Sequence, residues 1–316
     1  MGKLLVAAAL AGALSLAAAP LAAMAPPPSM AFNVAPRPVL SGLTTFGEGL
    51  GLNLTARRVS RDRLRTGSAA VGNPDGERLS SWRLDAQLDY EVLPRLTAIL
   101  GVPYSFDRFQ FNGADQRYDA LGDVTLLGRY AVYRDRPRAP RRELGLLAGV
   151  KLPTGATTVS AHGAPLSATQ QPGSGTTDFV FGAAGFAPWG EALLYGDLSR
   201  KFNTHAAYTF GDQLGANLGA YYPLGGAGVF ALTGELNLEA SDADRSIEAG
   251  SGVRPNGSVA NTGGWTVYAS PGLQWRVHGR TTLSVAVQLP TYRYVNGTQL
   301  AAQPTWVLGL HTRLGR

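Results

Sequence analysis

Residues 81–92, with the sequence SWRLDAQLDYEV, alternate between apolar and polar side chains at every position. The apolar set runs from Trp82 to Val92, and the polar or charged set runs from Arg83 to Glu91. Successive side chains of a strand point to opposite faces, so this segment predicts a β-strand with one apolar and one largely charged face. The apolar face would meet a core in a soluble sandwich, or lipid in a membrane barrel whose lumen takes the charged face.

Twelve segments of the chain have this strand character. Most are much longer than the ~5–6 residues that are usual for strands of soluble proteins. A strand tilted across a bilayer needs about 9–11 residues, and any extra length projects beyond the membrane. The expected strands cover residues 46–57, 81–92, 95–109, 120–133, 142–153, 176–187, 190–203, 211–222, 228–240, 264–277, 281–294 and 304–314.

The spacers between these segments alternate in length. Tight spacers such as Leu93–Pro94 and His278–Arg280 follow even-numbered segments. Long spacers such as Arg58–Ser80, Thr154–Gly175 and Ser241–Gly263 follow odd-numbered ones. An outer-membrane barrel has short periplasmic turns and longer outer loops. We therefore expect an all-β fold, a transmembrane antiparallel up-and-down β-barrel of about twelve strands with both chain ends on the periplasmic side.

Three tryptophans are expected on the lipid-facing surface. Trp265 and Trp275 lie ten residues apart on the apolar face of one expected strand, and Trp82 lies on the apolar face of another. At ~3.3 Å per residue and a strand tilt near 40°, ten residues span roughly 25 Å, which is the height of the apolar band of such barrels. The spacing predicts an aromatic girdle at both membrane interfaces.

The N-terminal region has the composition of a secretory signal. Lys3 provides a short basic region and Leu4–Ala19 an apolar one, and Ala23–Ala25 and Ser29–Ala31 are both candidate cleavage sites. An uncleaved anchor helix is the alternative interpretation. We expect a signal peptide and cleavage region at 1–31, an N-terminal lead at 32–45 and a barrel at 46–316, located in the bacterial outer membrane.

The polar faces of the expected strands would line the lumen. They carry eight acids and five bases, so a ring of one sign that selects ions is not indicated. The charges could border an open path, or they could pair across a packed interior. The expected lumen-lining residues are Arg83, Asp85, Asp89, Glu91, Asp123, Arg129, Lys151, Asp178, Asp197, Lys201, Glu235, Glu239 and Arg276.

Three prolines recur in similar settings on expected strands, at Pro103, Pro153 and Pro290. Proline removes a hydrogen bond from a sheet, and a closed barrel has no free edge to hide the loss. Pairing could simply end at these residues near the outer rim. The alternative is a bulge or gap that opens the wall sideways.

The formal net charge of +6 comes largely from two clusters, Arg57–Arg65 and Arg134–Arg142. Neither cluster belongs to a nucleic-acid recognition motif, so nucleic acid is not an expected partner. The first cluster opens a long loop, where guanidinium groups could bind the phosphates of lipopolysaccharide. An ordinary solvated loop is the alternative. The expected partners are outer-membrane lipid, lipopolysaccharide and a small-molecule solute.

Enzyme motifs are not evident. The four histidines stand apart, without a serine or aspartate at motif spacing, and no pair of them is placed to hold a metal. The chain has no cysteine, and its glycine-rich runs lack the lysine of a phosphate-binding loop. We expect no catalytic residues, no metal and no cofactor, although a site assembled from different strands would leave no local pattern.

Six stretches resemble a known family. They are 122–130 (GDVTLLGRY), 149–155 (GVKLPTG), 171–181 (QPGSGTTDFVF), 195–203 (YGDLSRKFN), 263–275 (GGWTVYASPGLQW) and 287–297 (VQLPTYRYVNG). Together they resemble the outer-membrane transporter family named for the meta-pathway of phenol degradation, over most of residues 40–315. That family is thought to be distantly related to the aromatic-hydrocarbon and long-chain fatty-acid channels.

The resemblance implies a channel or transporter for passive passage of small molecules, including apolar or aromatic ones, through a lumen lined by charges. A structural or interaction barrel closed by its own ion pairs is the alternative. An outer-membrane hydrolase and a soluble secreted β protein are further alternatives.

Overall fold

The computed structural model describes residues 50–314, except 112–113, 138–139, 162–163, 166–170, 205–207, 226–228, 247–258 and 279. The expected signal region 1–31 and lead 32–45 lie outside the described residues. Within the described ranges, no helix has the length and apolar character needed to cross a membrane.

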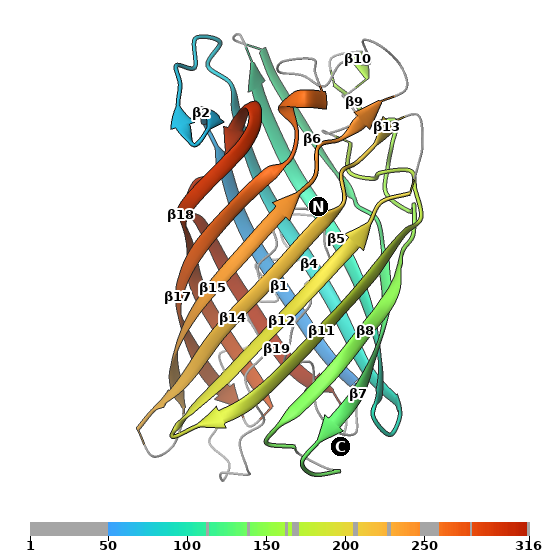
Figure 1. The fold of residues 1–316 in the computed structure, drawn as a ribbon, viewed down its shortest axis with the longest axis vertical. Helices are drawn as coiled ribbons and strands as arrows, with labels where there is room; N and C mark the ends of the chain where they lie inside the picture. Colours follow the sequence, from blue (N-terminus) through green and yellow to red (C-terminus); the bar gives the residue numbers. More distant parts are fainter. Residues whose placement is uncertain are drawn as a thin grey trace.

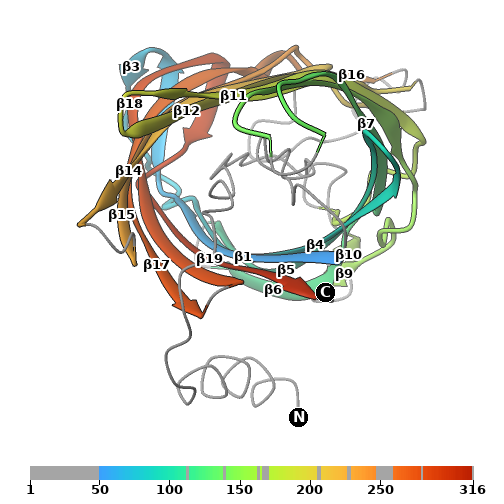
Figure 2. The same ribbon diagram turned by 90° about the horizontal axis from the view of Figure 1, so that it is seen from below.

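Twelve long antiparallel strands in the described part of the chain form a closed barrel (Figures 1 and 2). The ring closes where the first strand pairs with the last, from Leu50 opposite Leu314 to Arg58 opposite Trp306. The strands are β1 (Leu50–Arg61), β4 (Arg78–Leu93), β5 (Leu96–Phe111), β7 (Thr125–Arg134), β8 (Glu143–Lys151), β11 (Asp178–Trp189), β12 (Ala192–Phe202), β14 (Gln213–Leu224), β15 (Phe230–Ser241), β17 (Gly264–His278), β18 (Thr281–Ala301) and β19 (Thr305–Leu314). The expected fold class is confirmed, and the closed ring excludes a two-sheet sandwich.

Shorter elements gather at the end of the barrel that carries the long loops (Figure 1). They are β2 (Arg63–Gly67), β3 (Ala69–Ala70), β6 (Ala114–Leu121), β9 (Ser160–Ala161), β10 (Ala164–Pro165), β13 (Tyr208–Thr209), β16 (Arg245–Ser246) and the 3-10 turn η2 (Val259–Asn261). We call this the outer end and the opposite one the periplasmic end, because long loops face outward in such barrels.

Two segments expected to be loops are paired instead. Most of residues 110–119 belongs to the hairpin of β5 and β6, whose ladder runs from Tyr104 opposite Leu121 outward. The outer part of β18 pairs with β2, from Val295 opposite Gly67 to Ala301 opposite Arg63. Both ladders continue beyond the apolar band, where the sequence no longer alternates between apolar and polar residues.

The outer face of the barrel is apolar. Leu218 on β14 and Leu236 on β15 are 62% and 57% exposed, and many other large apolar side chains share this face. The residues that alternate with them along the strands are polar and buried, as Asn237 is. A continuous apolar exterior around a closed barrel fits hydrocarbon rather than water. The protein is a β-barrel of the bacterial outer membrane.

The three tryptophans expected in the girdle are exposed on this outer face. Trp265, near the outer end of β17, stacks on Tyr292 with ring centroids 4.5 Å apart. Trp275, near the periplasmic end of the same strand, stacks on Phe230 at 6.1 Å. Aromatic rings therefore lie close to both ends of the apolar band.

Replacing Leu218 with arginine should lower the free energy of unfolding in lipid vesicles by about 2–4 kcal/mol, because the residue lies midway along β14 at the depth of the hydrocarbon. Leu224, at the periplasmic end of the same strand, is the control, and Leu224→Arg should lower it by only about 0–1 kcal/mol. Equilibrium unfolding in urea measures both values. Equal losses in the two variants would contradict the placement of the membrane.

Candidate functional site

Twelve of the thirteen expected lumen residues share the parity of the buried polar residues of their strands, and Asp123 lies in the loop before β7. Arg83, Asp85, Asp89 and Glu91 come from β4, and Arg129 and Lys151 come from β7 and β8. The remaining residues come from the loop before β7 and from β11, β12, β15 and β17; they are Asp123, Asp178, Asp197, Lys201, Glu235, Glu239 and Arg276. The structure gathers most of these side chains into three networks.

The first network lies at the periplasmic end. Glu143 on β8 holds Arg129 at 2.5 Å and Arg134 at 2.6 Å, and Arg134 also reaches Glu91 on β4 at 2.9 Å. The side chains of Arg129 and Glu143 are each 1% exposed. Because buried charges interact more strongly than charges in water, this network ties three strands together from within.

The second network lines β12, β14, β15 and β17 and consists mainly of uncharged donors around two carboxylates. Asn217 donates to Asp197 at 2.8 Å, and Asn237 donates to Asn217 at 2.9 Å and to Glu235 at 3.0 Å. Tyr195 donates its hydroxyl to Glu235 at 2.7 Å. This part of the wall is polar and acidic.

The third network centres on Asp123, which follows β6 at the edge of the lumen. Its carboxylate accepts hydrogen bonds from the backbone N–H groups of Gly155 and Ser174, each at 2.9 Å, and from the Ser174 hydroxyl at 2.9 Å. Lys151 lies 2.7 Å from Asp123 and 2.7 Å from Asp178, and all three side chains are at least nine-tenths buried.

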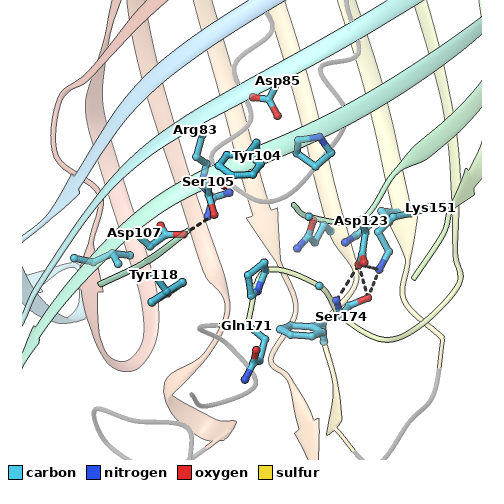
Figure 3. A pocket seen from close by; sticks show the side chains of 18 residues that line it. Arg83, Asp85, Tyr104, Ser105, Asp107, Tyr118, Asp123, Lys151, Gln171 and Ser174 are labelled. Carbon is cyan, nitrogen blue, oxygen red and sulfur yellow. Dashed lines mark hydrogen bonds and ion pairs between the residues drawn. The ribbon is translucent and has the colours of Figure 1, made fainter. Parts of the chain in front are cut away.

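A cavity of about 160 Å³ adjoins the third network, and Figure 3 shows its lining. Its walls include Arg83 from β4, Ser105 from β5 and Lys201 from β12, so it reaches across the interior between distant strands. Gln171 and Ser174, from the segment between β8 and β11, complete it. The lining mixes charged groups with apolar surface from residues such as Pro103, Tyr118 and Phe210.

Each of the three expected gap prolines lies where a ladder is interrupted. Beside Pro103, the pairing of β5 passes from β7, which ends at Gly101 opposite Thr125, to β6, which begins at Tyr104 opposite Leu121. Pro153 follows the end of β8. Pro290 lies beyond the last pair of β18 with β19, and the ladder of β18 with β17 shifts register next to it.

Sequence reasoning missed several interior charges. Arg57 was expected among the lipopolysaccharide-binding arginines, but it is 1% exposed and pairs with Asp85 at 2.6 Å, because it has the inward parity of β1. Arg134 has the outward parity of β7, and a register shift between Ala131 and Tyr133 turns it inward. Glu143 shares the parity of Lys151, so the alternation could have identified it.

In the described part of the chain, no three histidine, cysteine or acidic side chains are grouped to hold a metal ion. The cavity is small, and positively and negatively charged groups that form hydrogen bonds surround it. Such a lining can hold a small solute by weak polar and apolar contacts.

Several solved structures are similar to this chain. An outer membrane channel from Pseudomonas putida F1 superposes with a TM-score of 0.62 at 16% sequence identity, covering 85% of this chain and 97% of that chain. The toluene transporter TodX of P. putida gives a TM-score of 0.44 at 9% identity, covering 85% and 91%. The β domain of the Bordetella autotransporter BrkA gives 0.48 at 10% identity, covering 84% and 100%. No protein-family model and no curated protein matches the sequence.

Glu143→Gln should lower the free energy of unfolding by roughly 3–5 kcal/mol, because it leaves two buried guanidinium groups without their shared carboxylate. Asp115→Asn is the matched control: Asp115 also bridges two arginines, but on the exposed hairpin of β5 and β6. This control should change stability little, because exposed pairs are screened by water. Equilibrium unfolding and the temperature at which the folded form disappears on gels both report the difference. Equal behaviour of the two variants would be evidence against a dry interior network.

Glu77, in the outer loop before β4, provides a pH-dependent contact. Burial raises the pKa of Glu77 from 4.5 to about 7, and the neighbouring carboxylate of Asp75 adds to the rise. Asn73 holds the same turn through hydrogen bonds to the backbone of Glu77. Between pH 4.5 and about pH 7, Glu77 keeps a proton in the folded state that it has lost in the unfolded state. The free energy of unfolding therefore falls as the pH rises through this range.

Glu77→Gln should therefore stabilise the protein relative to the wild type at about pH 8 and much less at about pH 5. Proteolysis of the loop between β3 and β4, compared at the two pH values, measures the effect locally. The wild-type loop should be cut faster at the higher pH, and the variant should lose most of this dependence. A loop cut at one rate at both pH values in the wild type would show that Glu77 titrates normally.

Proposed function

We propose that the barrel is a channel through which small solutes pass without energy input between the outside and the periplasm. The cavity next to Asp123 carries this proposal, because it is a solute-sized space inside an outer-membrane barrel. The solved structure with the same fold and the highest TM-score given above is an outer membrane channel. The family resemblance in the sequence points to the same role.

The size and lining of the cavity suggest the kind of solute. A cavity of about 150 Å³ is large enough to hold one benzene ring. The cavity here, of about 160 Å³, has apolar surface from Pro103, Tyr118 and Phe210 beside charged groups of both signs. We propose that the solute is an apolar or aromatic molecule of about one ring. The polar groups of the walls accommodate it through hydrogen bonds.

The interrupted ladders bear on how a solute leaves the lumen. Pro103 and Gly122 both line the cavity, and both lie where β5 changes its pairing partner. Gly122 donates its N–H to the carbonyl of Pro103 at 3.0 Å, and the ladder of β5 is interrupted between this contact and the pair of Gly101 with Thr125. The cavity therefore reaches the barrel wall next to an interruption of the ladder. We propose that apolar solutes leave the lumen toward the membrane beside Pro103 and Pro153, with the break near Pro290 as a second opening.

Membrane lipid surrounds the apolar exterior, and we propose lipopolysaccharide as the partner at its outer rim. Arg58 points outward at this rim, exposed, with its guanidinium carbon 5.6 Å from the centre of the Trp82 ring. A guanidinium held over an aromatic ring at the membrane surface is well placed to bind a phosphate group.

The second candidate is a structural or interaction barrel closed by ion pairs. The network of Arg129, Arg134 and Glu143 at the periplasmic end favours it, because these charged side chains are paired and buried inside the barrel there. In this case solutes would not cross, and the outer loops would carry the function.

Swelling of liposomes and conductance of planar bilayers that contain the wild-type protein distinguish the two candidates. We expect flux of single-ring solutes, and a several-fold reduction in Ser105→Phe, because the new ring fills the cavity that Ser105 lines. Ser80→Phe is the control, since Ser80 has the outward parity of β4 and should leave flux unchanged. Absence of flux and of conductance both in the wild type and in the Asp123→Asn variant would refute the channel.

A further inference from the structure

The roof of the cavity comes from one inserted segment. Residues 152–159 and 171–177, which we call the lid segment, follow β8 and precede β11 respectively. Gln171, Pro172, Gly173 and Ser174 line the cavity from this side. Figure 3 shows Ser174 facing Asp123 and Lys151, which belong to the barrel wall. The lid segment therefore covers the cavity from this side, and its second part meets Asp123 and Lys151 through Ser174.

The two parts of the lid segment meet backbone to backbone. A side-chain carbon on Gly155 would lie 2.7 Å from the Cα of Gly173 and 2.8 Å from the carbonyl carbon of Gly122. Real side-chain carbons essentially never approach other atoms this closely, so only glycine fits. Gly173 also donates its N–H to the carbonyl of Ala156 at 2.9 Å. The lid segment is thus closely seated against the wall.

One carboxylate holds both parts in this position. Asp123 accepts from Gly155 in the first part and from Ser174 in the second, and Lys151 completes its surroundings. All of these groups are donors, and an ionised carboxylate is the side chain that can accept from all of them at once. An amide in its place would turn an N–H group toward these donors.

The lid segment is also part of the barrel wall. Leu152 donates its N–H to the carbonyl of Val124 at 2.7 Å, and Val124 donates its N–H to the Thr154 hydroxyl at 2.8 Å. These bonds close the wall beside the break at Pro103, where β6 and β7 are separated. Movement of the lid segment would uncover the cavity from above and from the side together.

We infer that the lid segment is a gate and that Asp123 is the latch that holds it closed over the cavity. Asp123 is a positioning residue: it acts on passage through the segment it holds. The inference rests on the proposed channel function, and it names how access to that same cavity is regulated. Release of Asp123 from Gly155 and Ser174 opens the route for solute.

Planar-bilayer conductance and liposome swelling test the gate with two unlike variants. Asp123→Asn removes the charge and the acceptor, whereas Gly173→Ala forces the two parts of the lid segment apart without changing charge. Both should raise conductance several-fold over the wild type. Asp115→Asn, which removes a charge on the outer hairpin, and Gly128→Ala, where a methyl group meets only ordinary contacts, are the matched controls and should conduct like the wild type.

Labelling of a single cysteine gives a readout that does not depend on flux. The chain has no cysteine, and Thr176 in the lid segment is buried, so Thr176→Cys should react slowly with a maleimide. Adding Asp123→Asn or Gly173→Ala should speed the reaction several-fold, and adding Asp115→Asn should not.

Faster labelling together with higher conductance in both lid variants supports the gate. Faster labelling in a barrel that conducts in no variant supports the latch and refutes the channel. A wild type that conducts, with lid variants that neither conduct more nor label faster, overturns the gate and leaves the channel function standing.

Discussion

The whole barrel depends on backbone hydrogen bonds between neighbouring strands, because hydrocarbon offers no other partner for an N–H or a carbonyl group. The ring can only be complete if every long strand is paired on both sides. Where that rule is relaxed, the chain replaces the missing bond: the Thr154 hydroxyl accepts the N–H of Val124 beside Pro153. These replacements lie toward the outer end, where loops can shield the open ladder.

The alternation of side chains follows from this ladder and decides what the interior contains. Every strand that puts leucine into lipid must put its next residue inside, so charges collect in a confined space. They are stable there because they neutralise one another, as Arg57 does with Asp85 and Lys151 with two aspartates. The interior consequently has polar walls, and a cavity lies where the lid segment meets the wall.

The sequence predicts what depends on periodicity. The twelve strands, the faces of residues such as Arg83 and Trp82, and the sorting of short and long connections all follow from local patterns. Arg134 escapes this reasoning because one register shift reverses its face. The role of Asp123 escapes it because its partners Gly155 and Ser174 are 32 and 51 residues away in the chain. Spacing of this kind leaves no local signal, and only the fold brings the groups together.

Closure between the first and last strands has a consequence for assembly. Leu50 and Leu314, which are paired, lie at opposite ends of the described chain. The ring therefore stays open until the final strand has been synthesised and delivered. Until then β1 presents a free backbone edge, and such edges readily pair with other chains. Contacts of such long sequence separation also form slowly. The protein is therefore most exposed to aggregation in the time before closure. Its topology requires that the chain be kept away from other chains during that interval.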